Sequence, residues 1–359
     1  MKKIGILTFH NAENYGAVLQ AYALKTYLQQ YKSFSTVDII DYKSPLIELS
    51  YKYFNSWSSY KSKGLRKIIS FLLQLFYLPK KIEKKKIFKK FDTDWLKSVD
   101  NDFNEYNSII YGSDQIWNPT LTDDDLIYFG KNYNGEKISY AASDGGELDL
   151  TDEIITYLKE FYRISCREKS LSDKLMKKLN SVSTVCDPVF LLSKDDWINK
   201  FAHKPSIDNY VLIYKISENL DLDKEAVKFA KKNNKKVVQI VYSKSIKKIF
   251  CLNQKIVSAI SPNEFVGYFA YADFIFTTSF HGTAFSIILE KDFYTLSFNK
   301  RSERITDLLK EVGLENRFVN TTPEYDEIES HKICYLEVSD RKDQYVNKSM
   351  DFLKEALND

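Results

Sequence analysis

The sequence lacks the features that mark secreted, membrane-spanning and zinc-binding proteins. Its four cysteines, Cys166, Cys186, Cys251 and Cys334, lie far apart and form no C-x-x-C pair, which argues against a zinc site or a disulfide framework. No stretch reaches about 18 consecutive apolar residues, so no transmembrane helix is expected. The apolar run that follows Met1 is too short for a signal peptide. Together these absences favour a protein of the reducing cytoplasm without a metal site.

Negative charge is almost absent from one segment of the chain. Between Tyr51 and Lys90, twelve Lys and Arg residues face a single acid, Glu83, which gives a local charge of +11. The whole chain carries only +3, so subtracting +11 leaves about −8 for the remaining residues. That acidic remainder would repel a polyanion, and we therefore expect no nucleic acid partner.

The basic segment also contains aromatic and leucine-rich stretches, and we treat residues 51–94 as an insertion in the first domain. Residues 64–79 are mostly apolar and predict a helix, and the lysines of residues 80–90 follow them directly. One interpretation is peripheral contact with an anionic membrane at its cytoplasmic face. The other is a core helix followed by a solvated lysine-rich face, and for the helix itself we favour this second interpretation.

Alternating strand and helix patterns open both halves of the chain. Strand, helix and strand are predicted at residues 4–8, 17–28 and 37–42 in the first half, and at 210–214, 224–232 and 236–242 in the second. This β-α-β order is typical of doubly wound parallel sheets, whose ligands collect at the carboxyl ends of the strands. The loop after the first strand lacks G-x-G-x-x-G, so no dinucleotide is implied.

With 359 residues, the chain exceeds what one hydrophobic core usually serves, so we expect two α/β domains. We place the first Rossmann-like domain at residues 1–200 and the second at residues 208–340. The segment 341–359 contains a last amphipathic helix, predicted from about Asp343 to Leu357. We expect this helix to pack back on the first domain.

The strongest site signal is the stretch from Thr277 to Ser286, where a strand pattern changes directly into a helix pattern. Ser279 is placed to cap that helix, and Gly282 lets a ligand approach the backbone. A helix start favours an anion, and His281 exchanges a proton near neutral pH. The turn therefore predicts phosphate binding together with acid catalysis, although a capped helix with a buried structural histidine gives the same pattern.

Polar residues also follow other predicted strands, where a doubly wound sheet places its site. Asp114 and Asp144 follow two such strands, and for each aspartate taken alone we favour the interpretation of an ordinary turn residue. Arg167 precedes the first turn of a helix, where its guanidinium can meet a carboxylate or a phosphate. The structural alternative is a surface ion pair with Glu168 or Asp173.

Together these residues resemble the polysaccharide pyruvyl transferase family, from the first strand to about Arg317. The motifs that carry the resemblance occur in order: Gly5-Ile6-Leu7, Asn14-Tyr15-Gly16-Ala17-Val18-Leu19-Gln20-Ala21-Tyr22-Ala23-Leu24, Gly112-Ser113-Asp114-Gln115-Ile116-Trp117, Ser139-Tyr140-Ala141-Ala142-Ser143, Arg167-Glu168-x-Ser170, Asp187-Pro188 and Ser279-Phe280-His281-Gly282. Each motif is weak by itself, whereas the ordered set is specific.

The resemblance implies a GT-B-like α/β fold, in which two Rossmann-like domains face each other across a cleft. It also implies an enzyme that moves pyruvate from phosphoenolpyruvate onto a hydroxyl pair of a sugar, as a ketal, with no metal or further cofactor. By the same resemblance, Arg167 holds the donor and His281 is the general acid. Some members carry Arg-Leu-His where this chain has Ser279-Phe280-His281. The work of one donor-binding arginine would then fall to Arg301, Arg304 or the helix start.

We assign three groups of site residues from these motifs. The catalytic candidates are His281 as the acid, with Asp114 and Asp144 as bases for the sugar hydroxyls. The donor-binding candidates are Arg167, Ser279, Phe280, Gly282, Thr283, Arg301 and Arg304. The acceptor side of the cleft is assigned to His10, Asn14, Tyr15, Gly16, Gln115 and Trp117.

Two other functions fit the same sequence. A GT-B glycosyltransferase with a nucleotide sugar donor would use the same cleft, because helix starts bind diphosphates equally well. A catalytically inactive glycan-binding relative is suggested by Ser279, which stands where some members have arginine. The sequence does not specify the acceptor sugar, whether in a polysaccharide or in a lipid-linked glycan precursor.

Overall fold

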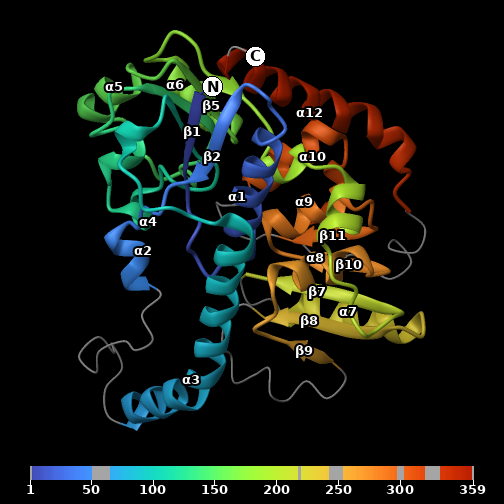
Figure 1. Ribbon diagram of the computed structural model, residues 1–359. Coiled ribbons are helices and arrows are strands. Elements are labelled where there is room, and N and C mark those ends of the chain that lie inside the picture. The colour runs from blue at the N-terminus through green and yellow to red at the C-terminus, as the bar shows by residue number, and fades with distance from the viewer. Residues whose placement is uncertain are drawn as a thin grey trace.

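The computed structural model contains two parallel β-sheets, one in each half of the chain, surrounded by helices (Figure 1). It describes residues 2–50, 65–216, 220–241, 254–296, 303–319 and 332–357. Each sheet has six strands, and neighbouring strands run parallel. The β-α-β order predicted for both halves is therefore confirmed.

The first sheet has the strand order β2-β1-β3-β4-β5-β6. Its strands are β1 (Lys2–Leu7), β2 (Phe34–Ile39), β3 (Ser108–Tyr111), β4 (Glu136–Ala142), β5 (Arg163–Cys166) and β6 (Ser183–Thr184). The helices of this half are α1 (Tyr15–Leu28), α2 (Pro45–Ser50), α4 (Pro119–Thr122), α5 (Asp152–Leu158) and α6 (Lys169–Met176). The strand order reverses between β1 and β3, and ligands of such sheets bind beyond the carboxyl ends of strands at this point.

The second sheet has the strand order β12-β11-β10-β7-β8-β9. Its strands are β7 (Tyr210–Lys215), β8 (Lys236–Val241), β9 (Lys255–Val257), β10 (Phe274–Thr277), β11 (Phe293–Leu296) and β12 (Phe318–Val319). Its helices are α7 (Leu220–Lys232), α8 (Pro262–Ala270), α9 (Phe280–Ile288) and α10 (Glu303–Val312). The order reverses between β7 and β10, so the β10–α9 turn occupies the corresponding ligand-binding position of this sheet.

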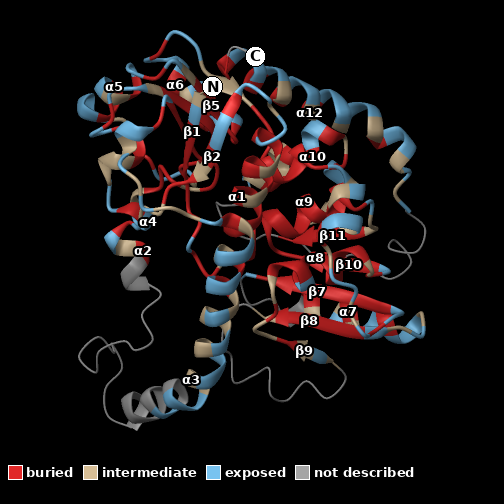
Figure 2. Ribbon diagram, in the orientation of Figure 1, coloured by how far each residue is buried: buried red, intermediate tan, exposed pale blue. Residues whose placement is uncertain are grey.

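Several short helices connect these elements. The 3-10 helices are η3 (Phe103–Glu105), η4 (Leu126–Phe129), η5 (Pro188–Leu191) and η9 (Glu315–Arg317), and the π-helical turns are η2 (Asp92–Leu96) and η6 (Asp196–Phe201). Figure 2 shows that burial is concentrated in the strands of both sheets and in the helices between them, α8 and α9. All nine residues of α9 are buried because this helix lies inside the molecule instead of at its surface.

The last helix, α12 (Tyr335–Leu357), packs back on the first domain as predicted. The Ser349 hydroxyl accepts a hydrogen bond from the Cys186 N–H at 2.8 Å, and the Tyr345 hydroxyl donates to the Val185 carbonyl at 3.3 Å. The helix begins earlier than the predicted start near Asp343. The Tyr335 hydroxyl donates to the Lys291 carbonyl at 2.7 Å, a contact with the second domain that the local sequence pattern does not reveal.

Helix α3 (Leu65–Phe91) differs from the helix predicted at residues 64–79 in its length and in its burial. It continues through Pro79 and the lysine run instead of ending at the proline, and Figure 1 shows it bent and projecting from the body of the molecule. A proline inside a helix removes one backbone hydrogen bond, which favours such a bend. The expectation of a core helix is also wrong, because Leu72 and Phe76 are 57% and 70% exposed. The aromatic part of the predicted insertion, residues 51–64, lies outside the described residues.

The two domains meet at the start of α1. The Tyr15 ring stacks on Phe265 of α8, with ring centroids 4.5 Å apart and an interplanar angle of 11°. The Tyr15 hydroxyl also donates a hydrogen bond to the Ile260 carbonyl at 3.1 Å. The loop that follows β1 is thereby held against the second domain, close to the β10–α9 turn.

Candidate active site

The β10–α9 turn has the strand-to-helix geometry predicted from Thr277 to Ser286. The Ser279 hydroxyl accepts a hydrogen bond from the Gly282 N–H at 3.3 Å and so caps α9. The Thr277 hydroxyl donates to the Tyr214 carbonyl at 2.9 Å, which fixes the end of β10 against β7. A Cβ added to Gly282 would lie 2.2 Å from the Thr277 hydroxyl oxygen, so only glycine fits here without a shift of the turn. His281 is thereby held in the first turn of α9.

Gly16 of the first domain faces the His281 ring of the second. A Cβ added to Gly16 would lie 2.0 Å from the imidazole Nδ1, so the absence of a side chain makes room for the ring. Gly16 is positioned by the Asn14 cap of α1, whose Oδ1 accepts from the Gly16 N–H at 3.0 Å. The predicted cleft residues Asn14 and Gly16 thus act by shaping the space around the candidate acid.

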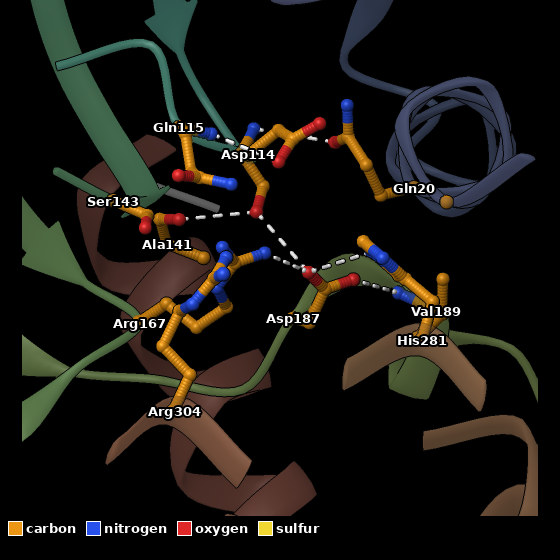
Figure 3. Close-up of polar contacts among 12 residues, drawn as sticks. Gln20, Asp114, Gln115, Ala141, Ser143, Arg167, Asp187, Val189, His281 and Arg304 are labelled. Atoms are coloured by element: carbon orange, nitrogen blue, oxygen red, sulfur yellow. Dashed lines mark hydrogen bonds and ion pairs between the residues drawn. The ribbon is translucent and has the colours of Figure 1, made fainter. Parts of the chain in front are cut away.

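The centre of the site is a buried carboxylate, Asp187, which we did not assign to the site from the sequence (Figure 3). Its Oδ2 accepts a hydrogen bond from the Arg167 Nη1 at 2.7 Å, and the His281 Nε2 lies 3.5 Å from the same oxygen. Its Oδ1 accepts from the Val189 N–H at 3.1 Å. The Ser113 hydroxyl lies 3.4 Å from Oδ2. One carboxylate therefore joins the two residues assigned to donor binding and acid catalysis.

Arg167 is buried among groups from both domains. Its Nε lies 3.3 Å from the Glu168 Oε1, and its guanidinium lies 4.7 Å from the centre of the Phe280 ring. The Arg304 Nε is 4.0 Å from the same Glu168 oxygen. The predicted surface ion pair of Arg167 with Glu168 or Asp173 is thus replaced by a buried cluster that includes Asp187.

The two carboxylates of this cluster have opposite pKa shifts. Burial raises the pKa of Asp187, but His281 and Arg167 outweigh that effect and hold the pKa well below its usual range. Burial also raises the pKa of Glu168, and here Arg167, Arg304 and the Ser143 hydroxyl do not fully offset it. For Arg167, burial lowers the pKa, whereas the carboxylates of Glu168 and Asp187 raise it above its ordinary value. Asp187 is therefore the permanent anion of the cluster, and Glu168 is the carboxylate that takes up a proton more easily.

Two polar atoms of this cluster, the Arg167 Nη2 and the Glu168 Oε2, are buried without a hydrogen-bond partner among the described residues. The His281 Nε2 makes only the longer contact of 3.5 Å with the Asp187 Oδ2. Buried polar groups are almost always hydrogen-bonded in folded proteins, so these atoms mark a place that a polar ligand would complete. The Arg167 Nη2 is a donor, which suits an anionic ligand.

Arg167 also lines a cavity of about 480 Å³ between the two domains and α12. The other residues of its wall are Lys169, Thr184, Asp307, Lys310, Glu311, Arg341, Gln344, Tyr345 and Lys348. Basic side chains outnumber acidic ones in this wall, so the space next to Arg167 favours a negatively charged molecule. Among the described residues, no group of three or more His, Cys, Asp or Glu side chains is placed to hold a metal ion.

The two predicted bases have different surroundings. The Asp144 carboxylate accepts from the Gly146 N–H at 2.8 Å and from the Leu148 N–H at 3.3 Å, so it shapes the turn after β4. Asp114 lies above the cluster in Figure 3, and its Oδ1 accepts from the Gln115 N–H at 2.9 Å. Its negative charge acts on the Arg167 guanidinium. Of the two aspartates, only Asp114 interacts electrostatically with Arg167 of the cluster.

Two of the predicted binding residues lie inside the protein instead of at the site. The Trp117 indole is fully buried, donates to the Tyr128 carbonyl at 2.9 Å and stacks on Phe129, so it belongs to the core of the first domain. The Thr283 side chain is also fully buried, and its hydroxyl lies 3.0 Å from the Thr295 hydroxyl of β11. Both residues lie in or next to a motif, but their side chains point into the core. The spacing of residues in the sequence does not show in which direction a side chain points.

The remaining predicted residues are placed as follows. The His10 ring is buried in the first domain, with its Nε2 2.8 Å from the Asp41 Oδ1. The Gln115 Oε1 accepts from the Asn118 Nδ2 at 2.8 Å. Tyr15 joins the domains through the stack and the hydrogen bond described above. Arg301 lies outside the described residues.

Comparison with known proteins identifies a family to which the chain is similar. The family model described as polysaccharide pyruvyl transferase matches residues 14–299 of the chain, which include every motif from Asn14 to the β10–α9 turn. Among curated proteins, the comparison found no match.

Several solved structures have a similar fold. A UDP-N-acetylglucosamine 2-epimerase has a TM-score of 0.54 at 12% identity, with 99% of this chain and 95% of that chain covered. A putative UDP-N-acetylglucosamine 2-epimerase from Listeria monocytogenes has a TM-score of 0.53 at 10% identity, with 97% and 90% covered. The S. aureus MnaA–UDP co-structure has a TM-score of 0.51 at 13% identity, with 97% and 91% covered. At this identity the likeness concerns the fold alone, and it confirms the predicted GT-B-like arrangement of two Rossmann-like domains.

Proposed function

The chain belongs to the polysaccharide pyruvyl transferase family, and from this premise we propose that it moves pyruvate from phosphoenolpyruvate onto a hydroxyl pair of a sugar. The product is a pyruvate ketal on a polysaccharide or on a lipid-linked glycan precursor. The observation that carries the proposal is the buried Asp187, which lies beside both Arg167 and His281 while the Arg167 Nη2 has no hydrogen-bond partner within the described structure.

The donor carries a carboxylate and a phosphate, so its site needs positive charge and hydrogen-bond donors. Arg167 supplies Nη2, since its Nη1 and Nε face Asp187 and Glu168. The start of α9 adds the favourable end of a helix dipole. The cation-rich cavity beside Arg167 supports the same assignment of an anionic donor to this region.

Ser279 stands where some relatives have an arginine, and its hydroxyl is occupied in capping α9. We propose that Arg304 takes over part of the missing positive charge, because its Nε lies 4.0 Å from Glu168 beside Arg167. Phe280 contributes by stacking on the Arg167 guanidinium, which keeps that side chain in place. Arg301 remains a second candidate from the sequence.

In the proposed reaction, His281 gives a proton to the methylene carbon of phosphoenolpyruvate, and the adjacent carbon becomes oxocarbenium-like. A sugar hydroxyl oxygen bonds to that carbon, the bond between this carbon and the phosphate oxygen breaks, and a neighbouring hydroxyl closes the ketal. One hydroxyl proton restores the imidazolium and the other leaves with phosphate, so protons balance. Asp187 places a fixed negative charge beside the imidazole throughout.

Each hydroxyl proton first needs an acceptor near the incoming sugar, which then passes it to the imidazole or to the leaving phosphate. We propose Asp114 for this role, because its charge already acts on Arg167 within the cluster. Asp144 is the weaker candidate, since both of its oxygens accept backbone N–H groups of the turn. His10, Asn14, Tyr15, Gly16 and Gln115 remain the proposed acceptor side of the cleft.

The test is phosphate release from phosphoenolpyruvate by the purified protein with a panel of glycan acceptors. We expect acceptor-dependent release that falls by about 10²-fold or more in His281→Ala. Lys354→Gln is the control, because this exposed side chain lies on α12 and, among the described residues, pairs with Asp351 of the same helix. Consumption of a nucleotide sugar without phosphate release would indicate a glycosyltransferase. Glycan binding without either reaction would indicate an inactive relative.

A further inference from the structure

Helix α3 exposes an apolar surface that the rest of the described chain does not cover. Leu72, Leu75 and Phe76 are 57%, 41% and 70% exposed. Their spacing of three and four residues puts them on one face of the helix, and Pro79 continues that face. We call these four residues the α3 patch. Figure 1 shows that this part of α3 projects away from both sheets, so the α3 patch is not the edge of either domain core.

The segment that follows the α3 patch is strongly basic. Residues 80–90 contain seven lysines and one acid, Glu83. Lys80, Lys86 and Lys89 are exposed, and none of the three has an ion-pair partner within the part of the chain that the structure describes. Lys84 instead turns inward, with its Nζ 5.7 Å from the centre of the Tyr15 ring. Some lysines of this run are therefore exposed to solvent, whereas Lys84 packs against the first domain.

We propose that α3 docks the protein on an anionic lipid surface, with the α3 patch in the interface and the exposed lysines at the headgroups. Stable peripheral binding usually combines two signals, apolar insertion and attraction of basic residues to anionic lipid. Both signals occur here on one projecting helix. No described helix is long and apolar enough to cross a membrane.

The observations favour a lipid over another macromolecule. A nucleic acid would use the lysines but would leave Leu72 and Phe76 exposed to water. A second copy of the chain would cover the apolar residues but would bring the same lysines together, and like charges repel. An anionic lipid surface satisfies both parts of the helix at once.

Docking would hold the interdomain site near the membrane, because the end of α3 packs against the first helix at the domain junction. Phe88 lies 5.2 Å from the Tyr15 ring, and Tyr15 stacks on the second domain. Docking on a lipid surface favours an acceptor sugar that is carried on a lipid. This conclusion about the acceptor rests on the proposed function. Lipid binding itself does not require the transfer reaction.

The experiment is sedimentation of the full-length protein with phosphatidylcholine vesicles that either contain or lack phosphatidylserine. We expect binding only to the anionic vesicles, weakened by salt. The triple variant Lys80→Gln, Lys86→Gln and Lys89→Gln should bind about 10²-fold more weakly. The double variant Leu72→Ser and Phe76→Ser should lose at least tenfold.

Two control variants test whether binding depends on α3 itself or on any exposed lysine or apolar side chain of the protein. The first control, Leu336→Ser, removes an apolar side chain that is 86% exposed on α12. The second control is a triple variant that removes three exposed lysines of the first domain, Lys131→Gln, Lys159→Gln and Lys178→Gln. Both controls should bind like the unmodified protein. The proposal is overturned if the unmodified protein does not bind anionic vesicles, if the controls weaken binding as much as the α3 variants, or if the α3 patch mediates dimerisation instead.

The α3 variants also separate this proposal from the transferase proposal. With a water-soluble acceptor they should release phosphate at the unmodified rate, because none of the changed residues lies at the site. Lipid binding without any transfer would overturn the proposed function only, and transfer without lipid binding would overturn the docking only.

Discussion

At the scale of single residues, the site depends on the space that Gly16 leaves for the His281 ring. The two residues come from different domains, and a Cβ on Gly16 would meet the imidazole at 2.0 Å. To relieve this clash, the imidazole would have to move. The proposed acid would then lie farther from the donor substrate, although no functional group would be lost. Small misplacements of catalytic groups typically cost about 10²-fold in rate.

We therefore predict that Gly16→Ala lowers the rate of phosphate release by about 10²-fold. In the His281→Ala background, the same substitution should have little further effect, because the ring it displaces is gone. The comparison of both single variants with the double variant measures this coupling. Independent, multiplying losses would contradict the role assigned to Gly16.

Asp187 provides the second residue-scale prediction. Asp187→Asn removes a fully buried negative charge beside Arg167, and breaking such a pair typically costs about 3–5 kcal/mol of folding free energy. We expect this loss near neutral pH in chemical denaturation, together with loss of phosphate release. Asp351→Asn, which changes an exposed aspartate of α12, should stay within about 0.5 kcal/mol.

The difference in folding free energy between the unmodified protein and Asp187→Asn should depend on pH in a predictable direction. Burial raises the pKa of Asp187, but His281 and Arg167 lower it further, so the folded-state pKa lies below the unfolded value. Stability from this carboxylate is then fully present above the unfolded pKa of about 4 and is lost as the pH falls towards the folded pKa. The gap between the unmodified protein and Asp187→Asn should narrow below about pH 4. A gap that widens in acid would contradict the assignment.

At the scale of elements, α12 supports the segment that carries Asp187. The Ser349 hydroxyl accepts from the Cys186 N–H, one residue before Asp187, and donates to the Tyr345 carbonyl. We predict that Ser349→Ala destabilises the protein by about 1–3 kcal/mol, because the buried N–H loses its partner. Ser339→Ala is the matched control on the same helix, since its hydroxyl bonds only within the first turn. Equal melting temperatures for the two variants would contradict this support.

Local chemistry explains which elements were predictable. The β10–α9 turn follows from Ser279 as a cap and Gly282 as a close contact, so its geometry and the position of His281 were predicted from residues that are neighbours in sequence. For α3, the apolar pattern predicted a helix but not its surroundings. Whether Leu72 and Phe76 are buried depends on what other elements cover them, which is a tertiary property.

At the scale of the whole molecule, the sequence predicted two doubly wound sheets because β-α-β order is repeated and parallel strands require crossovers. It did not predict Asp187 as the centre of the site. Asp187 precedes a proline and caps η5 through the Val189 N–H, which gives it an ordinary local explanation. Its other partners are Arg167, which comes from a neighbouring strand end of the same domain, and His281, which comes from the second domain and meets Asp187 only when the two domains pack together.

Two corrections have the same origin. Trp117 and Thr283 sit inside motifs of the site, but their side chains pack into the cores of their own domains. A motif locates the backbone of a site, whereas the direction of each side chain depends on the surrounding packing. For Arg167, the sequence named Glu168 as an alternative ion-pair partner but missed Asp187 and the burial of the pair, and its donor-binding role remains a prediction.

The central claim is that a three-carbon unit moves from phosphoenolpyruvate onto a glycan. The most direct measurement is mass spectrometry of a candidate glycan after incubation with ¹³C-labelled phosphoenolpyruvate and the protein. We predict an acid-labile ketal that retains the ¹³C label, forms in proportion to released phosphate, and is strongly reduced with His281→Ala. A glycan that gains no label across a broad acceptor panel, while a nucleotide sugar is consumed instead, would contradict the account.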